Sequence, residues 1–199
     1  MYHTFETSVS LTLAINQYFS ENETYYGGLY QMRLEQSNTY VKKQITHALL
    51  KLMETKVFVE IKITDIVRVA MVGRASFYRN FDSKEDVIKQ YLIEILKESE
   101  IRLKNEGREN ADWVENLFSH YKYNSEVYCL LYRSNLSHLI LNNIKAVCGP
   151  KTEQDNLQAY VSSWLAYGLF GWVNEWIARG MKESPKEMSK LIKETKNDN

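Results

Sequence analysis

The sequence predicts an all-α protein, and three observations support this fold class. The 199 residues include only two prolines and eight glycines, so few positions interrupt a helix. Long stretches consist of good helix formers, with apolar residues at helical spacing. Hydrophobic residues make up 44% of the chain, which is enough to bury the core of one domain or of two small ones.

Composition and motifs also exclude several classes of protein. No apolar run approaches the length of a membrane span, and Cys129 and Cys148 form neither a disulfide framework nor a CxxC motif, so we expect a soluble, cytoplasmic protein. The chain has no Gly-rich phosphate loop, nucleophile elbow or HExxH motif, and we therefore expect no catalysis and no cofactor. The four histidines lack metal-ligand spacing: His3, His47, His120 and His138.

Residues 1–36 differ from the rest, with few charges and many Thr, Ser and Tyr residues. One interpretation is a genuine N-terminal extension, with a short helix over residues 10–19 that packs on the body. The other is that residues 1–31 are not native and that translation starts at Met32, because Gly27-Gly28 can be encoded by a ribosome-binding sequence a few codons upstream. We favour the second interpretation. The segment lacks the basic start and compact apolar core of a secretory signal.

The first helix of the following region is expected over residues 39–54, where apolar residues form one stripe and lysines lie outside it. The stripe comprises Val41, Ile45, Leu49, Leu52 and Met53, and the outward lysines are Lys42, Lys43 and Lys51.

Residues 64–84 are predicted to form two short helices joined by a tight turn. Thr64 can cap the first helix, whose apolar side comprises Ile66, Val67, Val69 and Ala70. After the turn, a second helix runs from Arg74 to Phe81 and buries Phe77 and Phe81 at positions i and i+4.

The rest of the second helix carries groups that suit phosphate oxygens and base edges: Arg74, Ser76, Tyr78, Arg79 and Asn80. A helix-turn-helix presents its recognition helix to the DNA major groove in this way. The charge distribution agrees, because residues 37–81 hold eight Lys or Arg and three Asp or Glu, a net charge of +5 in a chain whose formal net charge is zero.

The run AMVGRASFYRNFDSKEDV resembles the DNA-binding domain of TetR-family transcriptional regulators, which commonly reads AGVSxGTFYxYFxxKEDL. The matching residues are Ala70, Val72, Phe77, Tyr78, Phe81, Lys84, Glu85 and Asp86, with Ser76 in place of Thr. The chain departs from the pattern at Met71, Gly73, Ala75 and Asn80. Met71 replaces the glycine of the turn and is expected to adopt a positive φ, whereas Gly73 is a fair N-cap.

From the residues and this resemblance we expect eight residues to meet DNA. Arg74 is placed to read a base edge, and Ala75 offers a methyl group to a thymine. The resemblance implies phosphate contacts for Ser76, Tyr78 and Lys84. Thr64 is expected both to cap its helix and to donate to a phosphate. Arg79 and Asn80 are expected to face the DNA.

Asp82 or Ser83 is predicted to cap a long helix that links this head to the rest of the chain, with acidic residues in its first turn. Its apolar positions are Val87, Ile88, Tyr91, Leu92, Ile95 and Leu96. The expected domains are thus a helix-turn-helix domain over 37–83, and a linker helix with a C-terminal effector-binding and dimerisation domain over 84–199.

The C-terminal region is predicted to contain helices near residues 112–123, 125–147, 154–179 and 185–196, punctuated by Gly149-Pro150 and by Gly180 as a C-cap glycine. The tract AYGLFGWVNEWIARGMKESPKEMSKLI resembles the C-terminal region of a TetR subgroup that includes regulators near dihydroxyacetone kinase genes.

The helix over 154–179 is apolar nearly all round, so it has to be covered on two sides. The resemblance implies that a second copy covers one side in a four-helix dimer interface, which we assign to Trp164, Leu165, Gly168, Gly171 and Trp172. Two heads would then reach successive major grooves about 34 Å apart. The alternative is that this helix is central to the core of a monomer.

Aromatic residues and histidines of the same region are candidates for a ligand pocket, although such residues more often pack a core. The candidates are Tyr121, Tyr128, Tyr132, His138, Trp164 and Tyr167, with His120 beside them. The function expected is that of a ligand-responsive repressor that binds a palindromic operator as a homodimer. The alternative is a coactivator or adaptor gated by a protein partner without a small-molecule effector.

Overall fold

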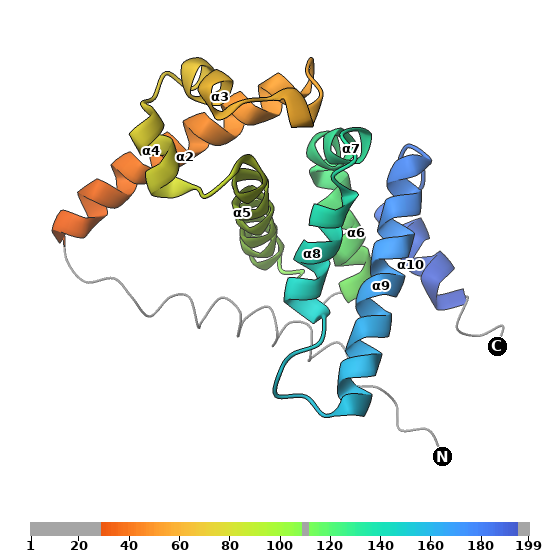
Figure 1. Cartoon of the computed structure of the whole chain (residues 1–199). Helices are drawn as coiled ribbons and strands as arrows, with labels where there is room; N and C mark the ends of the chain where they lie inside the picture. Colours follow the sequence, from red (N-terminus) through yellow and green to blue (C-terminus); the bar gives the residue numbers. More distant parts are fainter. Residues whose placement is uncertain (1–28, 109–111, 195–199) are drawn as a thin grey trace.

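The computed structural model describes residues 29–108 and 112–194, and their side chains from residue 38 onward. All regular structure in these ranges is helical, which confirms the predicted fold class (Figure 1). The head comprises α2 (Leu29–Met53), the 3-10 helix η1 (Phe58–Glu60), α3 (Ile63–Val69) and α4 (Arg74–Asn80), and α5 (Lys84–Asn105) leads out of it. The body comprises α6 (Trp113–Tyr123), α7 (Ser125–Arg133), α8 (Ser137–Cys148), α9 (Asn156–Ala178) and α10 (Pro185–Glu194). Within the described ranges, no helix is long and apolar enough to cross a membrane.

The first described helix starts earlier than the apolar pattern predicted. Helix α2 begins at Leu29 rather than near residue 39, because residues 29–53 include neither Gly nor Pro and are rich in helix formers. The expected helix over residues 10–19 lies outside the described residues. The proposed start at Met32 remains a prediction.

The prediction of one helix over residues 125–147 was wrong, because the chain breaks between α7 and α8. Asn135 adopts a left-handed conformation with φ of 57°. Its N–H donates to the carbonyl oxygen of Tyr132 (3.1 Å), and the N–H of Leu136 donates to that of Leu131 (2.9 Å). This Schellman pattern ends α7, and asparagine is the non-glycine residue that best tolerates it.

Two of the other helix ends that use the same pattern were indicated by the sequence. Met71 closes α3 with φ of 55°, and Gly180 follows α9 with φ of 83°. The N–H of Val72 donates to the carbonyl oxygen of Val67 (3.0 Å), and that of Met181 to the carbonyl oxygen of Trp176 (2.8 Å). The positive φ expected of Met71 and the helix-ending role of Gly180 are therefore confirmed.

The head is built around the apolar residues that the sequence placed inside it. Ile45, Leu49, Ile66 and Phe77 are fully buried. Val69 was also expected on the core side, but it is 38% exposed, since it is the last residue of α3, where the chain turns away from the core. Helices α2, α3 and α4 all pack on one another, and α2 also packs on α5.

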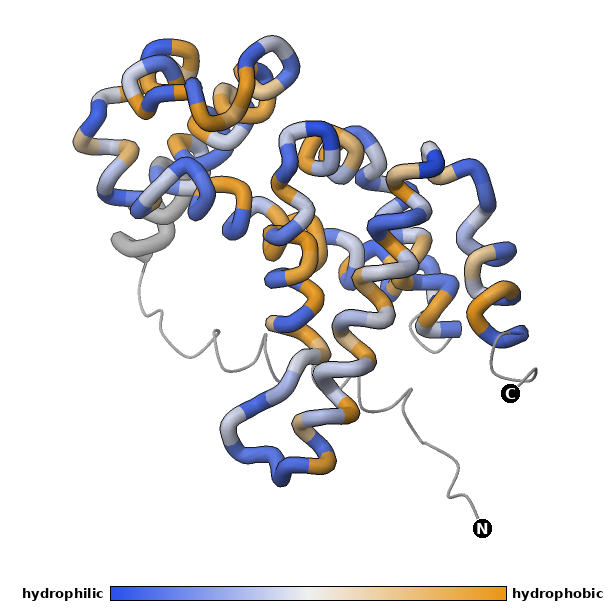
Figure 2. Tube along the Cα trace, turned by 45° about the vertical axis from the view of Figure 1, so that its right-hand side comes forward, coloured by the Kyte–Doolittle hydropathy of each residue, from blue (hydrophilic) through white to orange (hydrophobic). Residues whose placement is uncertain are grey.

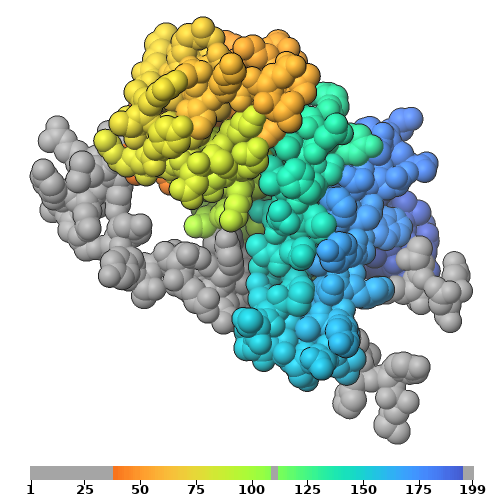
Figure 3. All heavy atoms as spheres, viewed as in Figure 1, coloured from red at the N-terminus to blue at the C-terminus, as the bar shows by residue number. Residues whose placement is uncertain are grey.

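Helix α5 joins the head to the body, where it packs against α6 and α8. In the body, α8 and α7 lie along α9, and α10 packs on α6. Figure 2 shows hydrophobic and hydrophilic residues alternating along these helices, as expected when each helix buries one side. Figure 3 shows the head, in orange and yellow, at one end of the molecule, with the green-to-blue body below and beside it.

The start of α5 is fixed by two polar side chains. Ser83 caps the helix, as predicted, by accepting a hydrogen bond from the N–H of Asp86 (3.1 Å). The Lys84 ammonium donates to the carbonyl oxygens of Phe58 (2.6 Å), Val59 (3.3 Å) and Ile61 (3.1 Å). It also lies 4.5 Å from the centre of the Phe58 ring. An ammonium has three N–H donors, and here each has a carbonyl acceptor.

This geometry corrects the phosphate contact expected of Lys84. A phosphate could be contacted only if the ammonium gave up a bond that holds η1 against α5. We therefore assign Lys84 to the stability of the head.

Replacing Lys84 by Met keeps the apolar stem and removes the ammonium. We expect the free energy of unfolding to fall by about 1–3 kcal/mol, because three backbone carbonyls lose a charged donor. Urea unfolding measures the loss, and Lys89→Met, at an exposed position of the same helix, is the matched control. Equal midpoints for the two variants would contradict the structural role of Lys84.

Candidate nucleic-acid interface

The recognition helix α4 is seated by its two phenylalanines. Phe77 and Phe81 are buried, and their ring centres lie 5.9 Å apart. Gly73 occupies the N-cap in an extended conformation with φ of −77°. The N–H groups of Ser76 (3.0 Å) and Phe77 (3.3 Å) donate to its carbonyl oxygen. The short helix thus turns one face to the core and the other outward.

The outward face carries most of the residues expected to meet DNA. Arg74, Ala75 and Arg79 are exposed, Tyr78 is 59% exposed and Ser76 is half-buried. Within the described ranges, no ion pair holds either arginine of α4. Their guanidinium groups are therefore available to an anionic partner.

Asn80 does not join this surface, contrary to expectation. Its side chain is only 9% exposed, and its Nδ2 donates to the carbonyl oxygen of Ser76 (2.7 Å) in its own helix. Position 80 follows Phe77 by nearly one turn, so its side chain shares the inner face with that ring. Asn80 is a packed residue of the head rather than a DNA-facing one.

Thr64 is also placed differently from the prediction. The N-cap of α3 is Lys62, so Thr64 lies inside the helix and is half-buried. The first turn is held by Asp65, whose carboxylate accepts from the backbone N–H of Lys62 (3.4 Å) and from Arg68 Nη2 (2.9 Å). Lys56 Nζ lies 3.5 Å from the same carboxylate. The hydrogen bond from Lys62 and these two cations lower the pKa of Asp65.

The six residues proposed for a ligand pocket do not converge on one cavity. Tyr121 and Tyr128 are buried in the core of the body, with ring centres 4.5 Å apart. The other four are exposed: Tyr132, His138, Trp164 and Tyr167. The pocket was predicted from the abundance of aromatic residues, and the sequence does not show which of these side chains point inward.

The buried tyrosines instead surround a hydrogen-bonded histidine. His120 Nδ1 lies 2.7 Å from Ser99 Oγ, and His120 Nε2 lies 2.6 Å from the hydroxyl of Tyr128. Ser99 donates its hydroxyl proton to the carbonyl oxygen of Ile95 (2.9 Å), so it accepts from Nδ1–H of His120. Nε2 is then the acceptor for the Tyr128 hydroxyl, and the neutral imidazole is satisfied at both nitrogens. These hydrogen bonds between Ser99, His120 and Tyr128 join α5, α6 and α7.

Burial, together with the charge of Arg102, lowers the pKa of His120 to about 3. In the unfolded chain the pKa lies near the ordinary value of 6.5. As the pH falls below 6.5, the unfolded state takes up a proton that the folded state does not bind. The stability contributed by neutral His120 is therefore complete above that pH and is lost progressively as the pH falls toward 3.

We expect this residue to contribute about 1.4 kcal/mol per pH unit to the slope of unfolding free energy in that window. Urea unfolding at a series of pH values measures the slope. His120→Gln should make it shallower, and the same substitution at the exposed His138 is the matched control. A slope that is the same in both variants would show that His120 titrates normally in the folded protein.

The proposed dimer face lies on α9 and is largely open in the single chain. Trp164 is 74% exposed, and a Cβ added at Gly168 or Gly171 would meet no atom within 4 Å. Leu165 and Trp172 are half-buried. A groove of about 560 Å³ runs between α9 and α10, lined by Tyr167, Gly168, Gly171, Trp172, Glu175, Trp176, Arg179, Glu183, Met188 and Leu191.

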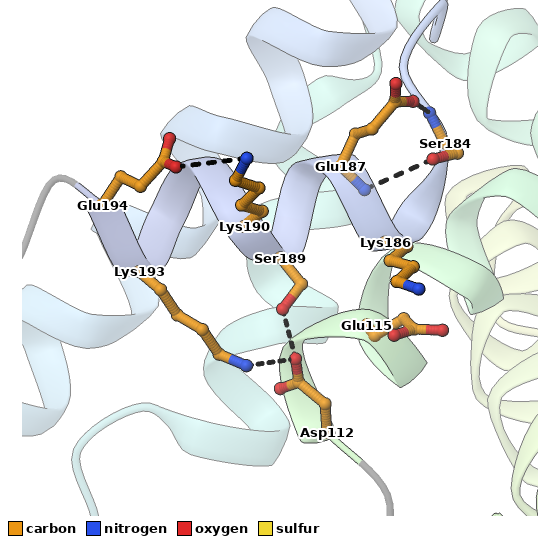
Figure 4. A pocket seen from close by; sticks show the side chains of 9 residues that line it. All are labelled: Asp112, Glu115, Ser184, Lys186, Glu187, Ser189, Lys190, Lys193 and Glu194. Carbon is orange, nitrogen blue, oxygen red and sulfur yellow. Dashed lines mark hydrogen bonds and ion pairs between the residues drawn. The ribbon is translucent and has the colours of Figure 1, made fainter.

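A second cleft, of about 680 Å³, lies where α10 meets the start of α6 (Figure 4). Asp112 caps α6 and accepts hydrogen bonds from Ser189 and from Lys193 (2.5 Å). Burial alone would raise the pKa of Asp112, but these two donors bring it below its ordinary value. Ser184 and Glu187 form a capping box at the start of α10. The charged groups thus fasten α10 to the body.

The described elements agree with comparisons to known proteins. Residues 108–198 match the family model TetR_C_8, described as "Transcriptional regulator C-terminal region". This part of the chain is therefore similar to the C-terminal region of TetR-family transcriptional regulators. This match confirms the resemblance inferred from the sequence.

One solved structure has the same fold over most of the chain, and a second is similar to it. A TetR transcriptional regulator from Streptococcus agalactiae 2603V matches with a TM-score of 0.53 and 16% identity, covering 81% of this chain and 96% of the other. The "Dihydroxyacetone kinase operon activator DhaS" matches with a TM-score of 0.48 and 17% identity, covering 78% and 93%. The comparison with curated proteins found no significant match.

Proposed function

We propose that the chain is a cytoplasmic, ligand-responsive repressor that binds a palindromic operator as a homodimer. The observation that carries the proposal is the outward face of α4, where two guanidinium groups that no described residue pairs with accompany the exposed Tyr78 and Ala75. A seven-residue helix packed by one face on its head can enter a major groove with the other face.

The residues of this face divide by the part of DNA they suit. Arg74, at the first position of α4, can reach a base edge, and its fork matches the O6 and N7 atoms of guanine. The hydroxyl groups of Ser76 and Tyr78 suit phosphate oxygens, which fix the register of the helix without reading sequence. Arg79 adds a cation to the same exposed side. Specificity would therefore depend chiefly on Arg74.

The homodimer is supported by the surface of α9. Exposed apolar residues recur along this helix at Leu157, Tyr160, Trp164 and Tyr167, a spacing that places them on one stripe. Gly168 and Gly171 continue the stripe and leave room for the backbone of another helix. Monomeric proteins rarely expose an apolar stripe of this length, so a second copy is its natural cover.

Effector control is supported by the path of α5. This helix begins at the head and packs on α6 and α8 of the body, so a ligand that shifts α5 would also move the head. The same exposed stripe on α9 supports a second candidate, a coactivator gated by a protein partner. In that case the partner, rather than a second copy, would cover Leu157, Tyr160 and Trp164.

The test of the function is binding of the purified protein to the intergenic DNA upstream of its own gene, against a random duplex of equal length at physiological salt. Specific binding by a dimer supports the proposal, and release by small molecules can then be screened. Equal weak binding to both duplexes by a monomer would favour the partner-gated alternative.

Arg74→Ala should relax the preference at one base position, at a cost of about 1–3 kcal/mol in specific binding. Binding to random DNA should change much less, because phosphate contacts supply most of that affinity. Titration of a panel of operators, each with one base pair changed, measures both effects. Arg133→Ala, on the exposed end of α7, is the control. If Arg74→Ala weakened specific and random binding equally, Arg74 would be a phosphate contact instead.

Gly168→Glu should convert the dimer to monomers, because a charge would be buried between two copies of α9. The single chain has room for the new side chain, so its own stability should change little. Sedimentation velocity measures the mass, and Asn142→Glu adds the same charge to an exposed position of α8. A Gly168→Glu protein that stays dimeric would place the interface elsewhere.

A further inference from the structure

Gln90 lies on the second turn of α5, and its half-buried side-chain amide joins three elements of the head. Gln90 Oε1 accepts from Lys42 Nζ of α2 (3.0 Å). Gln90 Nε2 donates to the backbone carbonyl oxygen of Asn80, the last residue of α4 (3.2 Å). The same nitrogen donates to Asp86 Oδ2 (2.8 Å). Figure 1 shows α4 beside α2, and α2 also packs on α5, so one side chain of α5 can reach both other helices.

This position requires an amide. The ammonium of Lys42 needs an acceptor, whereas the Asn80 carbonyl and the Asp86 carboxylate both need donors. Only the –CONH₂ group of Gln or Asn supplies one acceptor and two donors on the same carbon. The partners also fix the orientation of the amide, since a flipped group would set its oxygen against two other oxygens.

The amide gives α4 a directional bond in addition to its apolar packing. Phe77 and Phe81 hold the helix to the core, but dispersion and hydrophobic contacts have little directionality. The bond to the Asn80 carbonyl fixes the C-terminal end of α4 relative to α5. Lys42, 5.8 Å from the centre of the Phe81 ring, extends the same link to α2.

We propose that Gln90 is a positioning residue for sequence readout, which sets the angle at which α4 presents Arg74 to the DNA without touching DNA itself. This inference rests on the proposed DNA-binding function. Without the amide, α4 samples other orientations, and the fraction of heads ready for specific binding falls. Binding to random DNA needs no particular angle and is spared.

The test uses the full-length protein and two probes: a duplex that the wild-type protein selects from a random-sequence pool, and an unselected duplex of equal length. Gln90→Met should weaken binding to the selected duplex roughly five- to tenfold, the effect of losing about one net hydrogen bond. Affinity for the unselected duplex and its salt dependence should stay within about twofold, because the phosphate-contacting groups remain.

The matched control is Gln154→Met, the same substitution at a half-buried glutamine of the body that bonds to Ser162. It should leave both affinities unchanged. Lys42→Met removes only the α2 arm, and it should weaken selected-duplex binding by less than Gln90→Met. The two head substitutions should also be less than additive when combined, since they remove parts of one network.

The outcomes separate this inference from the proposed function. A wild-type protein that selects no duplex from the pool would overturn the DNA-binding function, and the inference with it. A wild-type protein that selects a duplex, with Gln90→Met equal to it, would overturn the inference alone. Equal losses on both duplexes would also overturn it, because they mark a general defect of the head. If Gln90→Met does not fold, Lys42→Met carries the test, and unchanged selectivity in that folded variant counts against the proposal.

Discussion

One helix is buried in both the head and the body, and the rest of the structure depends on how it is held in both places. Helix α5 packs on α2 in the head and on α6 and α8 in the body, and Val87, Ile88, Leu92 and Ile95 are buried along it. Apolar burial holds such a helix firmly but leaves its rotation and axial position loosely specified. Directional bonds have to supply that information.

Those bonds are grouped at the two ends of α5. On the head side, the Lys84 ammonium and the Gln90 amide bind backbone carbonyls of η1 and α4. On the body side, Ser99 accepts from His120, which in turn accepts from Tyr128. Each group is matched donor to acceptor, which is what makes buried polar chains specify one packing arrangement rather than weaken the core. A rearrangement of the body that moved Ser99 would thus act on α5, whose other end is hydrogen-bonded to the head.

The sequence predicted those parts of the fold that depend on local chemistry. The spacing of Phe77 and Phe81, the cap at Ser83 and the glycine at position 180 each act within a turn or two of their own position. The break at Asn135 was missed, although asparagine is the one local signal there, because the apolar pattern continues across it.

The remaining errors concern partners that lie far away in the sequence. Lys84 is paired with carbonyls 23 to 26 residues distant, and no pattern indicates that they will converge on it. Asn80 and Gln90 likewise gain their roles only when α2, α4 and α5 are assembled. The exposed face of α4 was easier to predict, because the buried positions of the helix can be recognised from the sequence and the other positions then face outward. The prediction of the ligand pocket was wrong because aromatic residues occur both in the interior and on the surface of this body, so their residue type does not indicate their burial.

The open stripe on α9 has a consequence for how the protein would respond to its own abundance. Under the proposed dimer, covering Trp164 and the bare backbone at Gly168 requires a second chain, so assembly follows the law of mass action. Below the dissociation constant of the dimer, the concentration of dimer rises with the square of the concentration of chains. Operator occupancy would then change more steeply than the protein concentration. A modest dilution during cell growth or division would therefore cause a proportionally larger fall in operator occupancy.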